Sequence, residues 1–107
     1  MAAEHRVVLC TCPTPTVAAE IATALIEQDL AACVNRVGGV KSWYRWEGQL
    51  RQDEEVLLVI KTTAARLPAL GDAIAKLHPY DLPEVIALPV VGGSAAYLRW
   101  LEEAVRS

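Results

Sequence analysis

Titratable side chains gather in one proline-rich stretch, HPYDLPEVIALPV, at residues 78–90. It contains His78, Tyr80, Asp81 and Glu84, which lie beside and between its prolines. Proline fixes the backbone φ angle, so these side chains are held in constrained positions. A constrained segment loses little entropy when it binds a ligand. The stretch is therefore a candidate binding site, and it is also the expected corner between a helix and a strand.

Cys10, Cys12 and Cys33 are the other reactive side chains of the sequence. Their number is odd, and in a cytosolic chain the default is that all three thiols stay reduced. Cys10 and Cys12 are two residues apart, so their side chains share one face if the segment is a strand. The spacing C-x-C is a weak indication of metal binding, because free cysteines are often small apolar core residues. The core interpretation is favoured for Cys33.

The elements that would position these side chains follow from hydropathy patterns and from the places of proline and glycine. Gly38-Gly39 predicts a bulge or bend within a long strand. Pro68 marks the first turn of the second helix and Pro79 ends that helix. The expected order is strand, helix, strand, strand, helix, strand, helix, at about residues 5–12, 15–29, 30–46, 49–62, 63–77, 84–91 and 94–105.

Two β-α-β units flanking a hairpin predict an α+β fold of the ferredoxin-like type, as one domain over residues 1–107 with an extra C-terminal helix. Pro89 cannot donate a hydrogen bond within a sheet, so the last strand should lie at an edge or carry a bulge. The hairpin is longer than two helices can cover, and it carries Trp43, Tyr44 and Trp46. Uncovered aromatic side chains predict a homo-oligomer with closed cyclic symmetry.

Composition argues against several classes of function. The net charge is −3 with no basic block, so we expect no nucleic-acid partner. The longest apolar runs, residues 56–60 and 85–91, are far shorter than the ~20 residues that span a bilayer. The first six residues are short and polar, so we expect no secretory signal and a cytoplasmic location. The sequence lacks the common hydrolase, zinc-protease, phosphate-loop and dinucleotide motifs, which indicates a protein that is not an enzyme.

Five segments occur in order with short spacers, namely AACVN (31–35), SWYRWEG (42–48), KTT (61–63), HPYDLPEVIALPV (78–90) and YLRWL (97–101). Together they resemble the CutA family of divalent-cation tolerance proteins, from Val7 to Leu101. The resemblance implies a ferredoxin-like protomer and a homotrimer in which the long hairpins pack against neighbouring subunits. It also implies an architecture similar to the PII signalling proteins, which bind small effectors in clefts between subunits. A role in tolerance of copper or another divalent cation follows, with no tightly bound cofactor.

The resemblance also implies two metal ligands, because Cys10 and His78 stand where the family's proposed copper ligands lie. Thiolate suits Cu(I) and imidazole suits Cu(II). Leu77 occupies the position of a second histidine in some members, and two protein ligands are fewer than the ~3–4 of a closed site. Cys12, a neighbouring subunit or a bound molecule would have to supply the rest. The alternative is a buried cysteine and a histidine whose charge suits a helix C-terminus.

A second candidate group consists of Tyr44, Trp46, Lys61, Tyr80 and Glu84. Lys61 ends an apolar strand and needs a partner, and Glu84 is the expected one. Such a pair beside aromatic rings would hold a nucleotide or another small anionic or zwitterionic effector in an intersubunit cleft. Alternatively, it is an internal salt bridge that fixes the trimer.

Two further alternatives stay open. The oligomer could be a scaffold for another, unknown protein. Cys10 and His78 could also form a nucleophilic couple, for which Asp81 is the nearest orienting group in the sequence.

Overall fold

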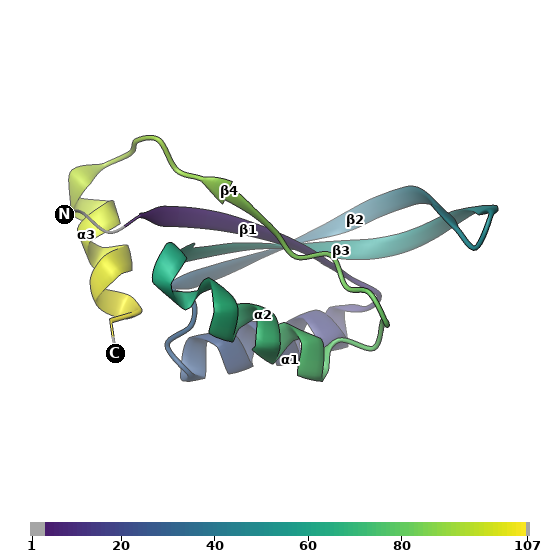
Figure 1. Ribbon diagram of the computed structural model, residues 1–107, viewed down its shortest axis with the longest axis horizontal. Helices are drawn as coiled ribbons and strands as arrows, with labels where there is room; N and C mark the ends of the chain where they lie inside the picture. Colours follow the sequence, from purple (N-terminus) through teal and green to yellow (C-terminus); the bar gives the residue numbers. More distant parts are fainter. Residues whose placement is uncertain (1–3, 107) are drawn as a thin grey trace.

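The computed structural model describes residues 4–106, and their element order is the expected one (Figure 1). The strands are β1 (His5–Cys12), β2 (Cys33–Trp46), β3 (Gln49–Thr63) and β4 (Ile86–Pro89). The helices are α1 (Pro15–Glu27), α2 (Leu67–Leu77) and α3 (Ala95–Ala104), with a 3-10 turn, η1 (Ala64–Arg66), before α2. No helix within this described range is both long and apolar enough to cross a membrane.

The four strands form one sheet in the order β2-β3-β1-β4, and every neighbouring pair is antiparallel. This is the ferredoxin-like α+β arrangement that the sequence predicted. Pro89 is the last residue of β4, which lies at the sheet edge, so the edge placement is confirmed. The order also leaves β2 and β4 as two open edges on opposite sides of the sheet.

Helices α1 and α2 cover one face of the sheet, where the hydrophobic core lies (Figure 1). The buried side of β1 consists of Val8, Cys10 and Cys12, as expected from alternation along a strand. Residues of the opposite face, such as Leu9 and Val59, are only half-buried. Neither α1 nor α2 covers that second face.

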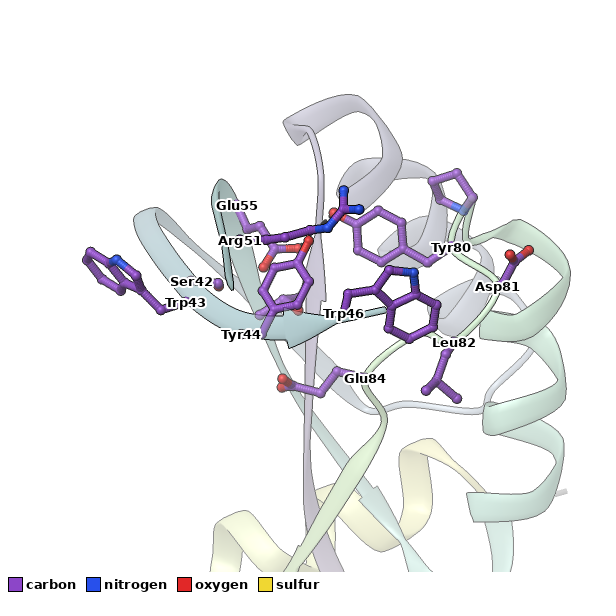
Figure 2. Close-up of a pocket in the computed structure, with 12 residues that line it drawn as sticks. Ser42, Trp43, Tyr44, Trp46, Arg51, Glu55, Tyr80, Asp81, Leu82 and Glu84 are labelled. Atoms are coloured by element: carbon purple, nitrogen blue, oxygen red, sulfur yellow. Dashed lines mark hydrogen bonds between the residues drawn. The ribbon is translucent and has the colours of Figure 1, made fainter. Parts of the chain in front are cut away.

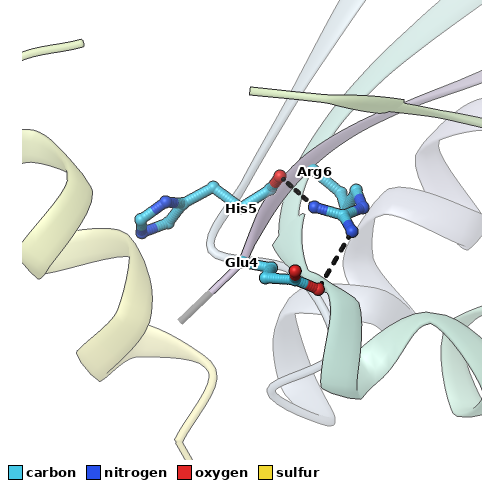
Figure 3. Close-up of polar contacts among 3 residues, drawn as sticks. All are labelled: Glu4, His5 and Arg6. Carbon is cyan, nitrogen blue, oxygen red and sulfur yellow. Dashed lines mark hydrogen bonds and ion pairs between the residues drawn. The ribbon is translucent and has the colours of Figure 1, made fainter. Parts of the chain in front are cut away.

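Helix α3 lies across one end of the sheet, near the start of β1 (Figure 1). The imidazole of His5 extends toward it, and its Nε2 lies 3.4 Å from an oxygen of Glu102 (Figure 3). Arg6 bonds to the His5 carbonyl at 2.9 Å and pairs with Glu4 at 3.2 Å. Directly after α3, the Val105 carbonyl accepts a hydrogen bond from Arg66 of η1 at 2.6 Å. The His5–Glu102 and Arg66–Val105 contacts therefore hold the C-terminal end of α3 against β1 and η1.

The β2–β3 hairpin extends well beyond the two helices (Figure 1). Its register breaks between Val37 and Val40, which confirms the bulge expected at Gly38-Gly39. Trp43 near its far end is 59% exposed, so the aromatic end is uncovered as predicted. Because β2 and β3 are paired out to Trp46 and Gln49, they hold the aromatic side chains away from the core.

The bounds of β2, α2 and β4 differ most from the sequence-based expectation. Strand β2 begins at Cys33 rather than residue 30, because the N–H groups of Leu30 and Ala31 bond back to the Leu25 carbonyl of α1. Thr63 ends β3 rather than opening a helix, and regular α2 begins at Leu67 with a proline in its first turn. Strand β4 is limited to residues 86–89, where it pairs with β1.

Candidate functional site

Two thiols and one imidazole meet at the buried side of the sheet. Cys10 and Cys12 come from β1, and His78 directly follows α2. Their ligand atoms all lie within 4.8 Å of one another, and all three residues are buried. Within residues 4–106 this is the one group of three or more potential metal-binding side chains at such distances. The structure therefore brings together the two residues implied by the family resemblance and adds Cys12. We call these three residues the thiol–imidazole cluster.

Both ring nitrogens of His78 have partners. Nε2 lies 2.8 Å from the carbonyl oxygen of Thr11, and Nδ1 accepts a hydrogen bond from the N–H of Tyr80 at 3.2 Å. A carbonyl only accepts and an N–H only donates, so the proton of neutral His78 sits on Nε2. The strand carbonyl between the two cysteines thus orients the imidazole. A metal ion bound by this imidazole would replace one of the two hydrogen bonds.

The two thiols influence each other's ionisation. Hydrogen bonding to Cys12, together with burial, raises the pKa of Cys10. The same hydrogen bond lowers the pKa of Cys12 against the opposing effect of burial. Cys12 is therefore the thiol that ionises first, with Cys10 as its hydrogen-bond donor. Thiolate is the form that binds metals.

The donor set fits copper. Two soft sulfur donors and one imidazole nitrogen are the ligands that copper prefers over carboxylate oxygens. Leu77 is 39% exposed, so the position at which some family members have a second histidine lies at the surface. The buried cluster does not include that position, because Cys12 supplies the third donor.

A cleft of about 710 Å³ lies between the far half of the hairpin and the segment that follows α2 (Figure 2). Its aromatic lining consists of Trp43, Tyr44, Trp46 and Tyr80. Its charged lining consists of Arg51, Glu55, Asp81 and Glu84. Four of the five residues in the second candidate group, Tyr44, Trp46, Tyr80 and Glu84, therefore surround one cavity.

Lys61 lies elsewhere, and the expected Lys61–Glu84 pair is not formed within the described residues. Lys61 donates a hydrogen bond to the side-chain oxygen of Asn35. The register explains the difference, because Lys61 pairs with Val7 near the start of β1. Glu84 precedes β4, and the first paired residue of β4 lies opposite Leu9, further along β1. Within one protomer the pair is absent, and the cleft lining there does not include the lysine that would attract an anion.

Glu55 is a functional candidate that the sequence reasoning missed. It is 8% exposed, and its Oε2 accepts a hydrogen bond from the hydroxyl of Tyr80 at 2.9 Å. Burial and this hydrogen bond raise the pKa of Tyr80. The one sequence signal is a glutamate placed directly before the apolar run at residues 56–60. The rings of Tyr80 and His78 are 4.7 Å apart, so the cleft and the thiol–imidazole cluster share a wall.

Two other expectations are corrected. Asp81 forms no hydrogen bond with His78, because the two ring nitrogens bond to Thr11 and Tyr80. The hypothetical nucleophile therefore lacks its orienting carboxylate. Cys33 is half-buried rather than interior in the protomer, because it lies at the start of β2 beside Tyr97. Burial and the neighbouring Cys33 raise the pKa of Tyr97.

The family model for the CutA1 divalent ion tolerance protein matches residues 6–104 of the chain. The chain belongs to the CutA family. It is 50% identical over 99 residues to the divalent-cation tolerance protein CutA of Thermus thermophilus, covering 92% of this chain and 96% of that protein. It is 47% identical over 97 residues to the human protein CutA, covering 91% of this chain and 54% of the human protein. The chain thus spans about half the length of that relative.

Solved structures of CutA proteins have the same fold. The Thermus thermophilus protein superposes with a TM-score of 0.94 at 48% identity, covering 95% of this chain and 99% of that one. CutA1 of Oryza sativa superposes with a TM-score of 0.95 at 44% identity, covering 98% of this chain and 96% of that one. An Arabidopsis thaliana relative is named chloroplastic and an Archaeoglobus fulgidus structure is named periplasmic.

Proposed function

We propose that this divalent-cation tolerance protein acts by binding copper at the thiol–imidazole cluster, without catalysing a reaction. The observation that supports this most is the pre-assembled group of Cys10, Cys12 and His78. Copper is the cargo of the site, and no resident cofactor is needed. Two thiols and one imidazole would hold it, and their burial would keep it away from water and from other thiols. Tolerance would follow from this sequestration.

Neighbouring groups of the protein adjust the acidity of one thiol and the orientation of the imidazole. Cys12 provides the more acidic thiol, since Cys10 donates a hydrogen bond to it. The Thr11 carbonyl orients the His78 imidazole, and a bound metal ion would replace one of the two hydrogen bonds of this ring. We also propose a cytoplasmic location, because a reducing compartment keeps both thiols available.

The assembly that we propose is a homotrimer of single-domain protomers that cover residues 1–107. Its support comes from the open edges of β2 and β4, which would pair between copies. Ile86 and Leu88 of β4 are 51% and 44% exposed, and the aromatic end of the hairpin is uncovered as well. Closed symmetry would bury these apolar surfaces in every copy.

A second candidate function is the binding of a small effector in the cleft. Its support is the cavity volume of about 710 Å³, which lies within the range of ~300–1,000 Å³ typical of small-molecule sites. Tyr44, Trp46, Tyr80 and Glu84 would contact this effector. The wall shared by Tyr80 and His78 would let effector and metal influence each other.

A competition titration tests the metal proposal. Reduced protein competes for Cu(I) with a chromophoric chelator, and the affinity is compared between wild type, Cys10→Ser, Cys12→Ser and His78→Gln. Each substitution removes one ligand, so we expect at least a roughly tenfold loss of affinity for each.

Cys33→Ser is the matched control, because it removes the thiol that lies outside the cluster. We expect it to leave the Cu(I) affinity unchanged. Equal affinity in all five proteins, or a loss confined to Cys33→Ser, would show that the cluster is not the copper site.

A further inference from the structure

The charged lining of the cleft is mostly acidic. Glu55, Asp81 and Glu84 contribute three carboxylates, whereas Arg51 contributes the one cationic side chain among the residues that line it. Glu55 is 8% exposed and bonded to Tyr80. Within residues 4–106, neither Asp81 nor Glu84 has a hydrogen bond or an ion pair. The cleft therefore offers unpaired negative charge next to a buried carboxylate.

Aromatic rings form the other part of the lining. Figure 2 shows Tyr44, Trp46 and Tyr80 around the opening, while Trp43 lies further out. The faces of such rings attract cations through their quadrupole. Carboxylates together with aromatic faces are the chemistry that recognises ammonium and guanidinium groups.

The spacing of the acids distinguishes an organic cation from a metal ion. The carboxylates of the cleft do not form a group of three with mutually close oxygens, since the thiol–imidazole cluster is the one such group in the described range. A compact divalent ion could not contact all three acids at once. A larger ligand with an apolar body can reach them from within a cavity of about 710 Å³.

Arg51 is the one cationic side chain among the residues that line the cleft. Its side chain extends from β3 toward Tyr80, across the opening (Figure 2). It is exposed and has no ion-pair partner within the described residues. It therefore repels a cationic ligand and attracts an anionic one, so its removal has opposite effects on the two.

We propose that the cleft binds a small organic cation, with an ammonium or guanidinium group placed between Glu84, Glu55 and the rings of Tyr80 and Tyr44. The proposal rests on the second candidate function above and gives its ligand class. It replaces the anionic effector that Lys61 had suggested. Glu84 and Asp81 supply the unpaired charge, and the aromatic rings contact the apolar body.

The test uses three ligands of similar shape and different charge: benzylammonium, benzyl alcohol and benzoate. Binding to the native, full-length protein is measured by ligand-observed NMR at low ionic strength. We expect benzylammonium to bind at least about tenfold more tightly than benzoate, with benzyl alcohol in between. If benzoate binds more tightly than benzylammonium, the proposal that the ligand is a cation is wrong, while the proposal that the cleft binds a small molecule still stands. No binding of any of the three would overturn the cleft function as well.

Two variants locate the site. Glu84→Gln should weaken benzylammonium binding about fivefold, which is the upper range for a partly exposed charge pair. Arg51→Gln should strengthen benzylammonium binding and weaken that of benzoate. Glu103→Gln on the exposed side of α3 is the control and should change neither. Benzylammonium binding that is equal in wild type and Glu84→Gln, or weaker in Arg51→Gln, would place the cation elsewhere.

Discussion

At the scale of single residues, His78 connects the two candidate sites. Its Nε2 contacts the Thr11 carbonyl within the thiol–imidazole cluster, and its Nδ1 accepts from the N–H of Tyr80. Tyr80 in turn donates to Glu55 in the cleft. A metal ion that displaced the hydrogen bond at Nδ1 would therefore alter the position of Tyr80. The proline-containing segment at residues 78–84 therefore connects the thiol–imidazole cluster with the cleft.

The Tyr80–Glu55 hydrogen bond predicts a pH effect on stability. The pKa of Tyr80 is raised by burial and by Glu55, above its ordinary value of about 10. A raised pKa favours the neutral phenol in the folded state, so this stabilisation is complete below about pH 10 and is lost as the pH rises further. Tyr80→Phe should lower the free energy of unfolding by about 1 kcal/mol at neutral pH, because Glu55 loses its donor.

Denaturant unfolding of both proteins between pH 7 and 11 measures this effect. The difference in the free energy of unfolding between wild type and Tyr80→Phe should become smaller above pH 10. Tyr44→Phe is the control, since its partner Asp53 lies on the exposed part of the hairpin. If the difference in the free energy of unfolding between wild type and Tyr80→Phe stays constant with pH, the hydrogen bond does not stabilise the fold.

At the scale of elements, the sequence predicted those features that depend on local chemistry. Pro89 indicated an edge strand because proline lacks a donor, and Gly38-Gly39 indicated a bulge because glycine tolerates unusual backbone angles. The Lys61–Glu84 pair is absent within the protomer because the strand register, which is not visible in one sequence, places the two residues apart. Glu55 was missed for a similar reason, since its partner Tyr80 is 25 residues away along the chain.

The bulge in β2 gives an element-scale prediction with a matched control. Gly39 has a φ of +72°, which an L side chain adopts with strain, whereas Gly38 has no such backbone angle. Open space surrounds both positions. Gly39→Ala should therefore lower the free energy of unfolding by about 1–2 kcal/mol, and Gly38→Ala should not. Thermal unfolding of the two variants would check this, and equal stability would mean that the bulge relaxes without cost.

At the scale of the whole molecule, the protomer has a covered and an uncovered face. Helices α1 and α2 cover the side that holds the thiol–imidazole cluster (Figure 1). The second face, the two sheet edges and the hairpin remain open. All three residues of the thiol–imidazole cluster come from one protomer, so the proposed trimer would not need to supply ligands to the proposed copper site. The cleft lies along the hairpin, so its open side would face a neighbouring copy.

The central claim is that each protomer binds one copper ion through Cys10, Cys12 and His78. Native mass spectrometry of reduced protein, supplied with one equivalent of Cu(I) per protomer, tests this most directly. We expect a trimer carrying one copper per protomer for wild type and for Cys33→Ser. The double variant Cys10→Ser/Cys12→Ser should give the same trimer without copper. Copper retained by the double variant, or absent from the wild type, would contradict the account.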